Sequence, residues 1–367
     1  MPQTPNQKSW RQLLVDALQD SRMGRRLAAS RWWQRVLPGL SPSQIAGVDD
    51  QVKAQVQTQA TNFTESSFAF GAKVYPYRLY VPTAPTPPDA GQPLQDPLQR
   101  PLIVLLHGCK QDAQDFAQGT AMNVLAEQHG CMVLYPEQLP KANQARCWNW
   151  YEPEHQQLDQ GEPGMIAALT RHVLSTDHAG NQADPDRVYI AGLSAGGAMA
   201  AVVAGLYPDL FAAVGVHSGL PAGAAQDMLS AFTAMRTGAN KGKRQTPLAL
   251  PTIVFHGSAD TTVHPENGEH ITGAALTAWE ATGMLLERRQ EQADAPTHST
   301  NQRTERRVYR SAEGPSYVEH WLIDDGPHAW SGGDAAGSFT APEGPSASEA
   351  MLAFFLQHKK RPKPTET

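Results

Sequence analysis

Residues 187–208 read RVYIAGLSAGGAMAAVVAGLYP, and this stretch decides the fold. RVYIA indicates a strand, and the residues after Ser194 indicate a helix. Between them, GLSAG at 192–196 fits the G-x-S-x-G pattern, in which a sharp turn lifts a serine hydroxyl to the top of a sheet. Its two glycines remove side chains that would collide across the turn, and the hydroxyl then sits over the positive N-terminus of the helix. The stretch therefore predicts that Ser194 is a nucleophile; the alternative is a serine that only caps a helix.

From residue 102 onward the chain alternates short apolar strands with helix-length segments. The strands are predicted at 102–106, 131–135, 187–191, 212–216, 252–256 and 317–323, and the helices at 113–129, 163–178, 195–207, 224–236, 267–284 and 346–358. Such alternation is typical of a mainly parallel central sheet with helices on both faces. Residues 68–82 predict a β-hairpin or two edge strands, whereas the polar stretch 285–307 predicts a surface excursion.

The composition indicates a folded, mildly acidic protein. Of 367 residues 40% are hydrophobic and 18% charged, which excludes disorder for most of the chain. A net charge of −6 gives no general attraction for polyanions, so nucleic acid is not expected as a partner. The longest apolar runs are too short to span a bilayer. The first residues lack the pattern of a secretory signal, which predicts a cytoplasmic protein.

The N-terminal residues differ in charge from the rest of the chain. Residues 7–38 have the periodicity of an amphipathic helix and a large excess of Lys and Arg over Asp. This helix is predicted to pack on the main domain as an arm or to anchor the protein to an anionic or hydrophobic surface. We therefore predict a basic helical arm at 1–60, a catalytic domain at 61–358 and a flexible tail at 359–367.

A serine nucleophile needs a base within hydrogen-bond reach, and that base must be oriented by a carboxylate. The strand at 252–256 runs into a loop that carries Asp260, and the strand at 317–323 runs into a loop that carries His328. Both loops are expected at the carboxyl edge of the sheet, beside Ser194. The order serine, acid, histidine is that of the α/β-hydrolase fold. We predict Ser194, Asp260 and His328 as the catalytic triad.

Four other residues compete for the roles of acid and base. His256 ends a strand that is expected to be buried, and it is interpreted as a core histidine or a residue behind the site. His264 follows in the next loop, where it could lie near the pocket. Asp324 and Asp325 come shortly before His328 and are interpreted as turn-formers.

The tetrahedral intermediate of acyl transfer needs two N–H donors for its oxyanion. Ala195, the residue after the nucleophile, is predicted to supply one. The loop that follows the strand at 102–106 contains Cys109, whose backbone N–H is predicted to supply the other. The three cysteines are too few for a disulfide scaffold and none has zinc-ligand spacing, so no metal is expected. The scheme requires no cofactor.

Several segments in order give the chain a resemblance to a known family. They are HGC at 107–109, CWNW at 147–150, GEP at 161–163, RVYIAGLSAGGAMA at 187–200, YPDLFAAVGVHSG at 207–219, HGSADTTVHPENG at 256–268 and GPHAWSGG at 326–333. With them the chain resembles the polyhydroxybutyrate depolymerase family of esterases over roughly residues 68–358. The resemblance implies the triad and the oxyanion donors named above.

The resemblance carries two further implications about the site. It places Trp148, Trp150 and Trp330 near the substrate mouth, although tryptophans of this kind are equally compatible with the core. It also implies a disulfide between Cys109 and Cys147, with Cys131 as a buried strand residue.

Together these features predict a serine carboxylester hydrolase that cleaves hydroxyalkanoate or related esters through an acyl-enzyme on Ser194. Relatives of the family act on feruloyl and acetyl groups of plant polysaccharides, and such an esterase is the first alternative. The second is a binding protein that associates with polyester granules or membranes through residues 7–38. Acyl specificity, the choice between polymer and small ester, and the oligomeric state are left open by the sequence.

Overall fold

The computed structural model describes residues 62–83, 98–239, 249–292, 303–312 and 314–360. The predicted arm at 1–60, with its helix at 7–38, lies outside the described residues. Most of the predicted tail at 359–367 lies outside them as well. Within the described part of the chain, no helix combines the length and the hydrophobicity needed to cross a bilayer.

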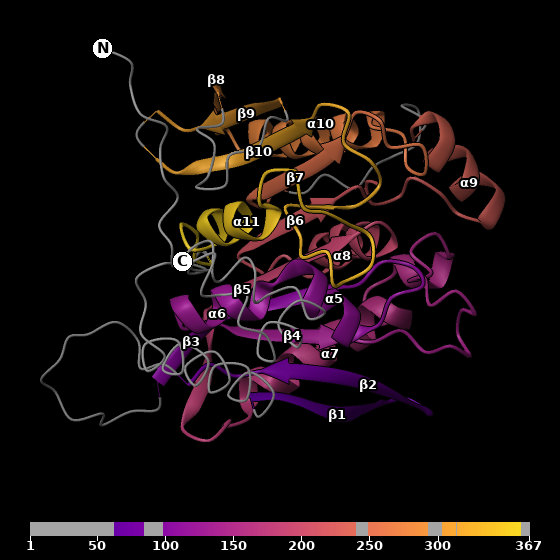
Figure 1. Cartoon of the computed structure of the whole chain (residues 1–367), viewed down its shortest axis with the longest axis vertical. Coiled ribbons are helices and arrows are strands. Elements are labelled where there is room, and N and C mark those ends of the chain that lie inside the picture. The colour runs from indigo at the N-terminus through magenta and orange to yellow at the C-terminus, as the bar shows by residue number, and fades with distance from the viewer. Residues whose placement is uncertain (1–61, 84–97, 240–248, 293–302, 313, 361–367) are drawn as a thin grey trace, which may run out of the picture. The chain divides into compact units, whose positions relative to one another are not determined.

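A ten-stranded sheet with the order β1-β2-β4-β3-β5-β6-β7-β10-β9-β8 organises the described residues (Figure 1). The six neighbouring strands β4, β3, β5, β6, β7 and β10 run parallel to one another. At one edge β1 and β2 pair antiparallel with each other and β2 with β4; at the other, β9 pairs antiparallel with β10 and β8 with β9. The strands are β1 Phe63–Phe70, β2 Lys73–Tyr80, β3 Leu98–Leu106, β4 Met132–Pro136, β5 Asn181–Leu193, β6 Ala213–His217, β7 Thr252–Gly257, β8 Glu287–Gln292, β9 Thr304–Arg310 and β10 Ser316–Ile323. This arrangement confirms the predicted mainly parallel sheet. Of the two possibilities for residues 68–82 it shows the hairpin, which begins earlier, at Phe63, and ends at Tyr80.

Helices cover both faces of this sheet. They are α5 Ala113–Thr120, α6 Met122–His129, α7 Gly161–Ser175, α8 Ala195–Leu206, α9 Met228–Thr237, α10 Glu266–Ala281 and α11 Ala347–Phe355. Core clusters place α5, α6 and α11 on one face and α7 and α8 on the other (Figure 1). The sequence of β3 is a continuous apolar run because the strand is buried on both faces. Leu102 and Val104 pack toward α7 and α8, whereas Ile103 packs toward α5.

The helix predicted at 113–129 is divided into α5 and α6 at Ala121, which has a left-handed backbone with φ 51°. In a continuous helix the carbonyls of Gly119 and Thr120 would accept from the next turn. Instead, Asp334 N–H donates to Gly119 O at 2.8 Å and Ser348 Oγ donates to Thr120 O at 2.6 Å. The helix ends here because Asp334, in the loop before α11, and Ser348, in the first turn of α11, bond to the carbonyls that would continue it.

The stretch at 285–307 is expected to be a surface excursion, but its ends form β8, at the edge of the sheet, and β9, which pairs with both β8 and β10. The charges that conceal these strands have specific partners: Arg306 pairs with the buried Glu319 of β10, and Arg307 pairs with Glu269 of α10. A charged sequence can therefore form a strand inside the sheet, because carboxylates of neighbouring elements pair with its arginines.

Candidate active site

Ser194 lies in the sharp turn between β5 and α8. Its backbone angles, φ 58° and ψ −121°, lie in a region that residues other than glycine rarely adopt. Its N–H donates to His217 O at the end of β6, at 2.9 Å. The strained turn presents the hydroxyl at the carboxyl edge of the sheet, as the G-x-S-x-G pattern predicts.

The glycines of this motif allow two segments of backbone to meet. A Cβ at Gly196 would collide with the carbonyl oxygens of Leu106 and His107, and a Cβ at Gly192 would lie 2.7 Å from Leu106 O. The loop that carries Cys109 therefore packs directly against the serine turn. Any larger residue at these positions would separate the two segments.

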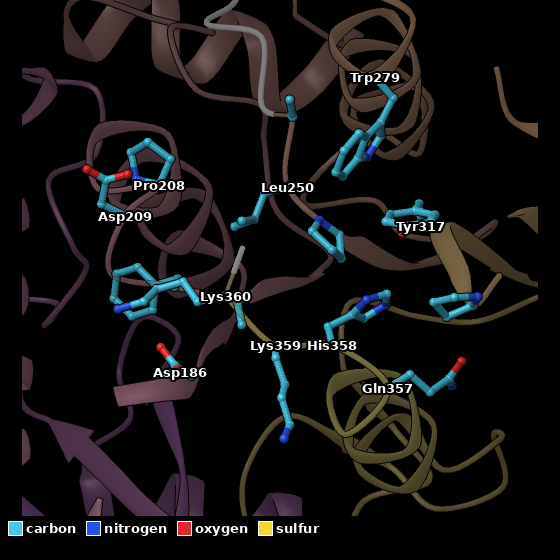
Figure 2. Close-up of a pocket in the computed structure, with 15 residues that line it drawn as sticks. Asp186, Pro208, Asp209, Leu250, Trp279, Tyr317, Gln357, His358, Lys359 and Lys360 are labelled. Carbon is cyan, nitrogen blue, oxygen red and sulfur yellow. The ribbon is translucent and has the colours of Figure 1, made fainter. Parts of the chain in front are cut away.

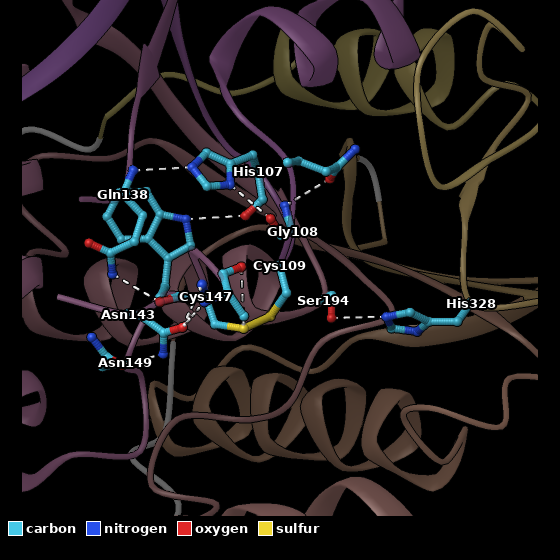
Figure 3. Close-up of a disulfide and its surroundings, with 12 residues drawn as sticks. His107, Gly108, Cys109, Gln138, Asn143, Cys147, Asn149, Ser194 and His328 are labelled. Carbon is cyan, nitrogen blue, oxygen red and sulfur yellow. Dashed lines mark hydrogen bonds between the residues drawn. A yellow bond between two sulfur atoms is a disulfide. The ribbon is translucent and has the colours of Figure 1, made fainter. Parts of the chain in front are cut away.

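Ser194, His328 and Asp260 form one hydrogen-bonded relay. His328 Nε2 lies 2.9 Å from Ser194 Oγ (Figure 3), and His328 Nδ1 lies 2.7 Å from Asp260 Oδ2. The three residues come from loops after β5, β10 and β7, which are separated in sequence but end at one edge of the sheet. This is the geometry that a serine nucleophile, its base and the orienting acid require.

The Asp260 carboxylate is held in its ionised form. Burial alone would raise its pKa, but the nearby ring of His256 and hydrogen bonds from His328 and the Val263 N–H more than offset that effect and lower the pKa below its usual range. Oδ1 accepts from the N–H groups of Thr262 and Val263 at 2.9 and 2.8 Å, which leaves Oδ2 for His328. His328 is thereby held with a proton on Nδ1 and a free lone pair on Nε2.

The four residues that compete for the roles of acid and base lie outside the relay. His256 is buried, donates from Nε2 to Val263 O at 2.8 Å and lies 3.5 Å from Asp260 Oδ2, so it supports the acid from behind. His264 is exposed and its Nδ1 accepts from Glu266 N. Asp324 and Asp325 are exposed in the turn after β10.

Cys109 and Cys147 are joined by a disulfide (Figure 3), whereas Cys131 is free and buried. The pairing implied by the family resemblance is therefore confirmed. The bond ties the loop after β3 to the CWNW segment. Ala195 is the first residue of α8, where backbone N–H groups have no acceptor within the helix.

The disulfide is expected to stabilise the fold. Because it closes a loop of 38 residues, replacing both Cys109 and Cys147 with serine should lower the free energy of unfolding by about 3–4 kcal/mol, measured by urea denaturation. Cys131→Ala serves as the control that removes a buried thiol without breaking the bond. In the denatured, unreduced wild type, alkylation should label one thiol; labelling of three would contradict the disulfide.

The three tryptophans expected at the substrate mouth are buried instead. Trp148 is 0% exposed and donates from Nε1 to His107 O at 3.1 Å. Trp330 is 1% exposed, donates to Ser348 Oγ and packs edge-on against Phe116. Trp150 is 4% exposed within the same core cluster as Trp148. The burial of all three indoles favours the alternative that these residues belong to the core.

Sequence reasoning missed the polar residues that support the loop after β3. Gln111 is buried and its Oε1 accepts from Gly108 N at 2.9 Å. Gln138, Asn149 and Glu162 are also buried, and Gln138 donates to His107 Nε2 and to Cys147 O. Asn149, which stands between Trp148 and Trp150, was the available signal, but no motif spacing connects these positions.

Two other features do not belong to this site. A cavity of about 550 Å³ lies at the amino ends of the strands, lined among others by Asp186, Ala212 and Tyr317, and thus at the edge opposite the triad (Figure 2). Among the described residues, Glu152, Glu154 and His155 bring ligand atoms within 4.8 Å of one another. Exposed acidic groups of this kind are common without a metal, so the cluster does not indicate one.

Comparison with known sequences places these features in context. Residues 87–285 match the family described as esterase PHB depolymerase. Poly(3-hydroxyalkanoate) depolymerase C of Paucimonas lemoignei is 33% identical over 243 residues, which cover 62% of this chain and 54% of that protein. Feruloyl esterase B of Thermothelomyces thermophilus is 31% identical over 222 residues, 55% of this chain and 72% of that protein. The chain thus spans about half the length of that depolymerase.

Solved structures share the fold at lower identity. An acetyl xylan esterase from Aspergillus awamori superposes with a TM-score of 0.56 at 18% identity, covering 80% of this chain and 98% of that one. A puromycin-hydrolyzing peptidase of Mycobacterium tuberculosis gives a TM-score of 0.50 at 16% identity, covering 83% of this chain and 40% of that one. With the sheet order above, these likenesses confirm the α/β-hydrolase fold.

Proposed function

The chain belongs to the esterase PHB depolymerase family, and from that premise we propose that it is a serine carboxylester hydrolase acting through an acyl-enzyme on Ser194. One observation carries the proposal: Ser194 Oγ, His328 and Asp260 are joined by hydrogen bonds of 2.9 and 2.7 Å in a strained turn at the carboxyl edge of the sheet. Covalent catalysis by serine depends on such a relay.

The reaction follows from the positions of these groups. His328 Nε2 takes the proton of Ser194 while Oγ attacks the ester carbonyl, and the oxyanion accepts hydrogen bonds from the backbone N–H groups of Cys109 and Ala195. His328 then gives the proton to the leaving alcohol. In the second half a water molecule, deprotonated by His328, releases the acid and restores Ser194.

Covalent labelling separates this hydrolase from a non-catalytic binding protein. A fluorophosphonate probe should add one label per chain, and mass spectrometry of the peptide should place it on Ser194. The physical reason is that only a serine whose proton is taken by a neighbouring base displaces fluoride quickly. Pretreatment with the probe should abolish hydrolysis of p-nitrophenyl butyrate; a protein that hydrolyses the ester but carries the label elsewhere contradicts the assignment.

The proposed substrate is a hydroxyalkanoate ester presented by a water-insoluble polymer, with feruloyl or acetyl esters as the alternative. Helix α9 favours a polymeric substrate, because it exposes a cluster of large apolar side chains. Met228, Leu229 and Phe232 are 59%, 79% and 56% exposed, which is unusual for such residues. The helix adjoins the acid loop, since His264 N donates to Met235 O at 2.7 Å. An apolar surface beside the site suits a solid polyester better than a soluble polysaccharide.

The apolar side chains of α9 give a test of this choice. Replacing Met228, Leu229 and Phe232 with serine should slow the hydrolysis of suspended polyhydroxybutyrate by roughly 10–100-fold, because each side chain loses about 0.5–1 kcal/mol of contact with the polymer. Turnover of p-nitrophenyl butyrate should stay within about twofold. Leu285→Ser, at an equally exposed position before β8, is the control. Equal losses on both substrates would contradict a role in polymer binding.

The disulfide bears on the compartment in which the enzyme works. Disulfides persist in oxidising environments and are rare in reducing ones. We therefore propose an oxidising compartment, in contrast to the cytoplasm predicted from the first residues. Contact with granules through residues 7–38 stays a prediction.

A further inference from the structure

Glu162, near the start of α7, is a buried carboxylate that the proposed mechanism does not use. It is 3% exposed. Its Oε1 accepts from Gln138 Nε2 at 2.5 Å and from Asn149 Nδ2 at 2.7 Å, and its Oε2 accepts from Asn149 N at 2.7 Å. His155 Nδ1 lies 3.3 Å from Oε2. A buried charge is costly unless such donors satisfy it, so its presence here calls for a role.

The first connection from Glu162 to the active site runs through Gln138 and ends in the disulfide. Gln138, which Glu162 holds, also donates from Nε2 to Cys147 O at 2.9 Å. Asn149 follows Cys147 closely in the CWNW segment. The disulfide then links Cys147 to Cys109, whose N–H is assigned to the oxyanion (Figure 3).

The second connection runs through hydrogen bonds. Gln138 N–H donates to His107 Nε2 at 3.1 Å, so the ring proton of the neutral imidazole must be on Nδ1. Nδ1–H in turn donates to Gly108 O at 2.8 Å. Burial lowers the pKa of His107 to about 4, which keeps the ring neutral at neutral pH.

Both connections end at the peptide group between Gly108 and Cys109. In a trans peptide the C=O and the N–H point in opposite directions within one plane, and the described residues contain no cis peptide. A hydrogen bond that fixes Gly108 O therefore also fixes the direction of the Cys109 N–H. The disulfide holds the Cβ of the same residue from the other side.

We infer that Glu162 is a positioning residue for ester hydrolysis, which orients the Cys109 N–H toward the oxyanion through Gln138, His107 and the disulfide. This inference rests on the proposed function. It predicts that Glu162 affects the transition state more than substrate binding, because an oxyanion donor acts on charge that develops during the reaction.

Glu162→Gln tests the inference with almost no change in shape. A carboxylate accepts at both oxygens, whereas the glutamine amide places an NH₂ group opposite at least one of the donors of Gln138 or Asn149. We expect kcat for p-nitrophenyl butyrate to fall roughly 10–100-fold, with KM within about twofold, since complete loss of one oxyanion donor costs about 10²–10³. The inhibition constant of an aryl trifluoromethyl ketone, whose serine adduct carries an oxyanion, should rise by a similar factor.

Glu319→Gln is the matched control for damage to the fold alone. Glu319 on β10 is 2% exposed and accepts from Arg306, Ser316 and Trp321, so its replacement disturbs a comparable buried network. We expect this variant to unfold at lower temperature but to keep kcat and the inhibition constant within about threefold. Asn149→Ala is the milder second variant, which removes one donor to Glu162 and should lower kcat roughly three- to tenfold.

The outcomes are distinct. Wild-type kcat in a folded Glu162→Gln protein, equal losses in the Glu319 control, or unchanged inhibition by the ketone would overturn the positioning role. If Glu162→Gln does not fold, unchanged kcat in Asn149→Ala overturns it in the same way. A wild-type protein that neither hydrolyses esters nor binds the ketone would instead refute the proposed function.

Discussion

Replacing Ser194 with alanine is expected to lower kcat for p-nitrophenyl butyrate by at least about 10⁴-fold, because the acyl-enzyme can no longer form. The remaining rate would come from the oxyanion donors and from binding. The thermal unfolding temperature should change by no more than about 2 °C: alanine keeps the β-carbon at this turn, and the Ser194 hydroxyl is bonded to His328 rather than to the core.

Ser218 offers a matched control for this substitution. It follows β6 at the same edge of the sheet, is fully buried and also has a positive φ of 48°. Ser218→Ala should keep at least about a third of the wild-type kcat. A Ser194→Ala protein that retains more than a few per cent of the activity, after removal of wild-type contamination, would show that another group carries the reaction.

The central strands could be predicted from the sequence because each is buried on both faces. The sequences of such strands are short apolar runs, and the turns between them can be recognised from a few neighbouring residues. The last two strands of the sheet, β9 and β8, could not be predicted in this way. Their charged residues resemble a surface loop, and their pairing depends on partners such as Glu319 and Glu269, which lie elsewhere in the chain. The break at Ala121 has the same origin, since its cause is Asp334 and Ser348.

In the candidate site too, residues in local patterns could be predicted, whereas those that depend on distant partners could not. The G-x-S-x-G turn and the rule that parallel strands end at one edge led to Ser194, Asp260 and His328, which the structure brings within hydrogen-bond distance. The tryptophans were misplaced because the acceptor that buries an indole N–H, such as His107 O for Trp148, is not visible in sequence. Glu162 was missed because its contact with Gln138 follows no repeat or spacing.

The second large effect is expected from Asp260→Asn, and it follows from which oxygen the backbone already holds. The N–H groups of Thr262 and Val263 donate to Oδ1, so the amide oxygen of the asparagine must occupy that position. Its NH₂ group then replaces Oδ2, 2.7 Å from His328 Nδ1, and has to donate to that nitrogen. The ring proton moves to Nε2, and His328 can no longer accept the proton of Ser194.

A wrong tautomer should lower kcat roughly 10⁴-fold at neutral pH while the fold and KM change little. Asp325→Asn is the control, because Asp325 is the exposed carboxylate nearest in sequence to His328 and the asparagine tolerates its φ of 53°. If Asp260→Asn costs less than about tenfold while Asp325→Asn costs more, the orienting acid is in the turn after β10. Ring ¹⁵N chemical shifts of His328 give an independent readout: the proton should reside on Nδ1 in the wild type and on Nε2 in Asp260→Asn, since the loss of activity is attributed to that proton and not to the loss of a charge.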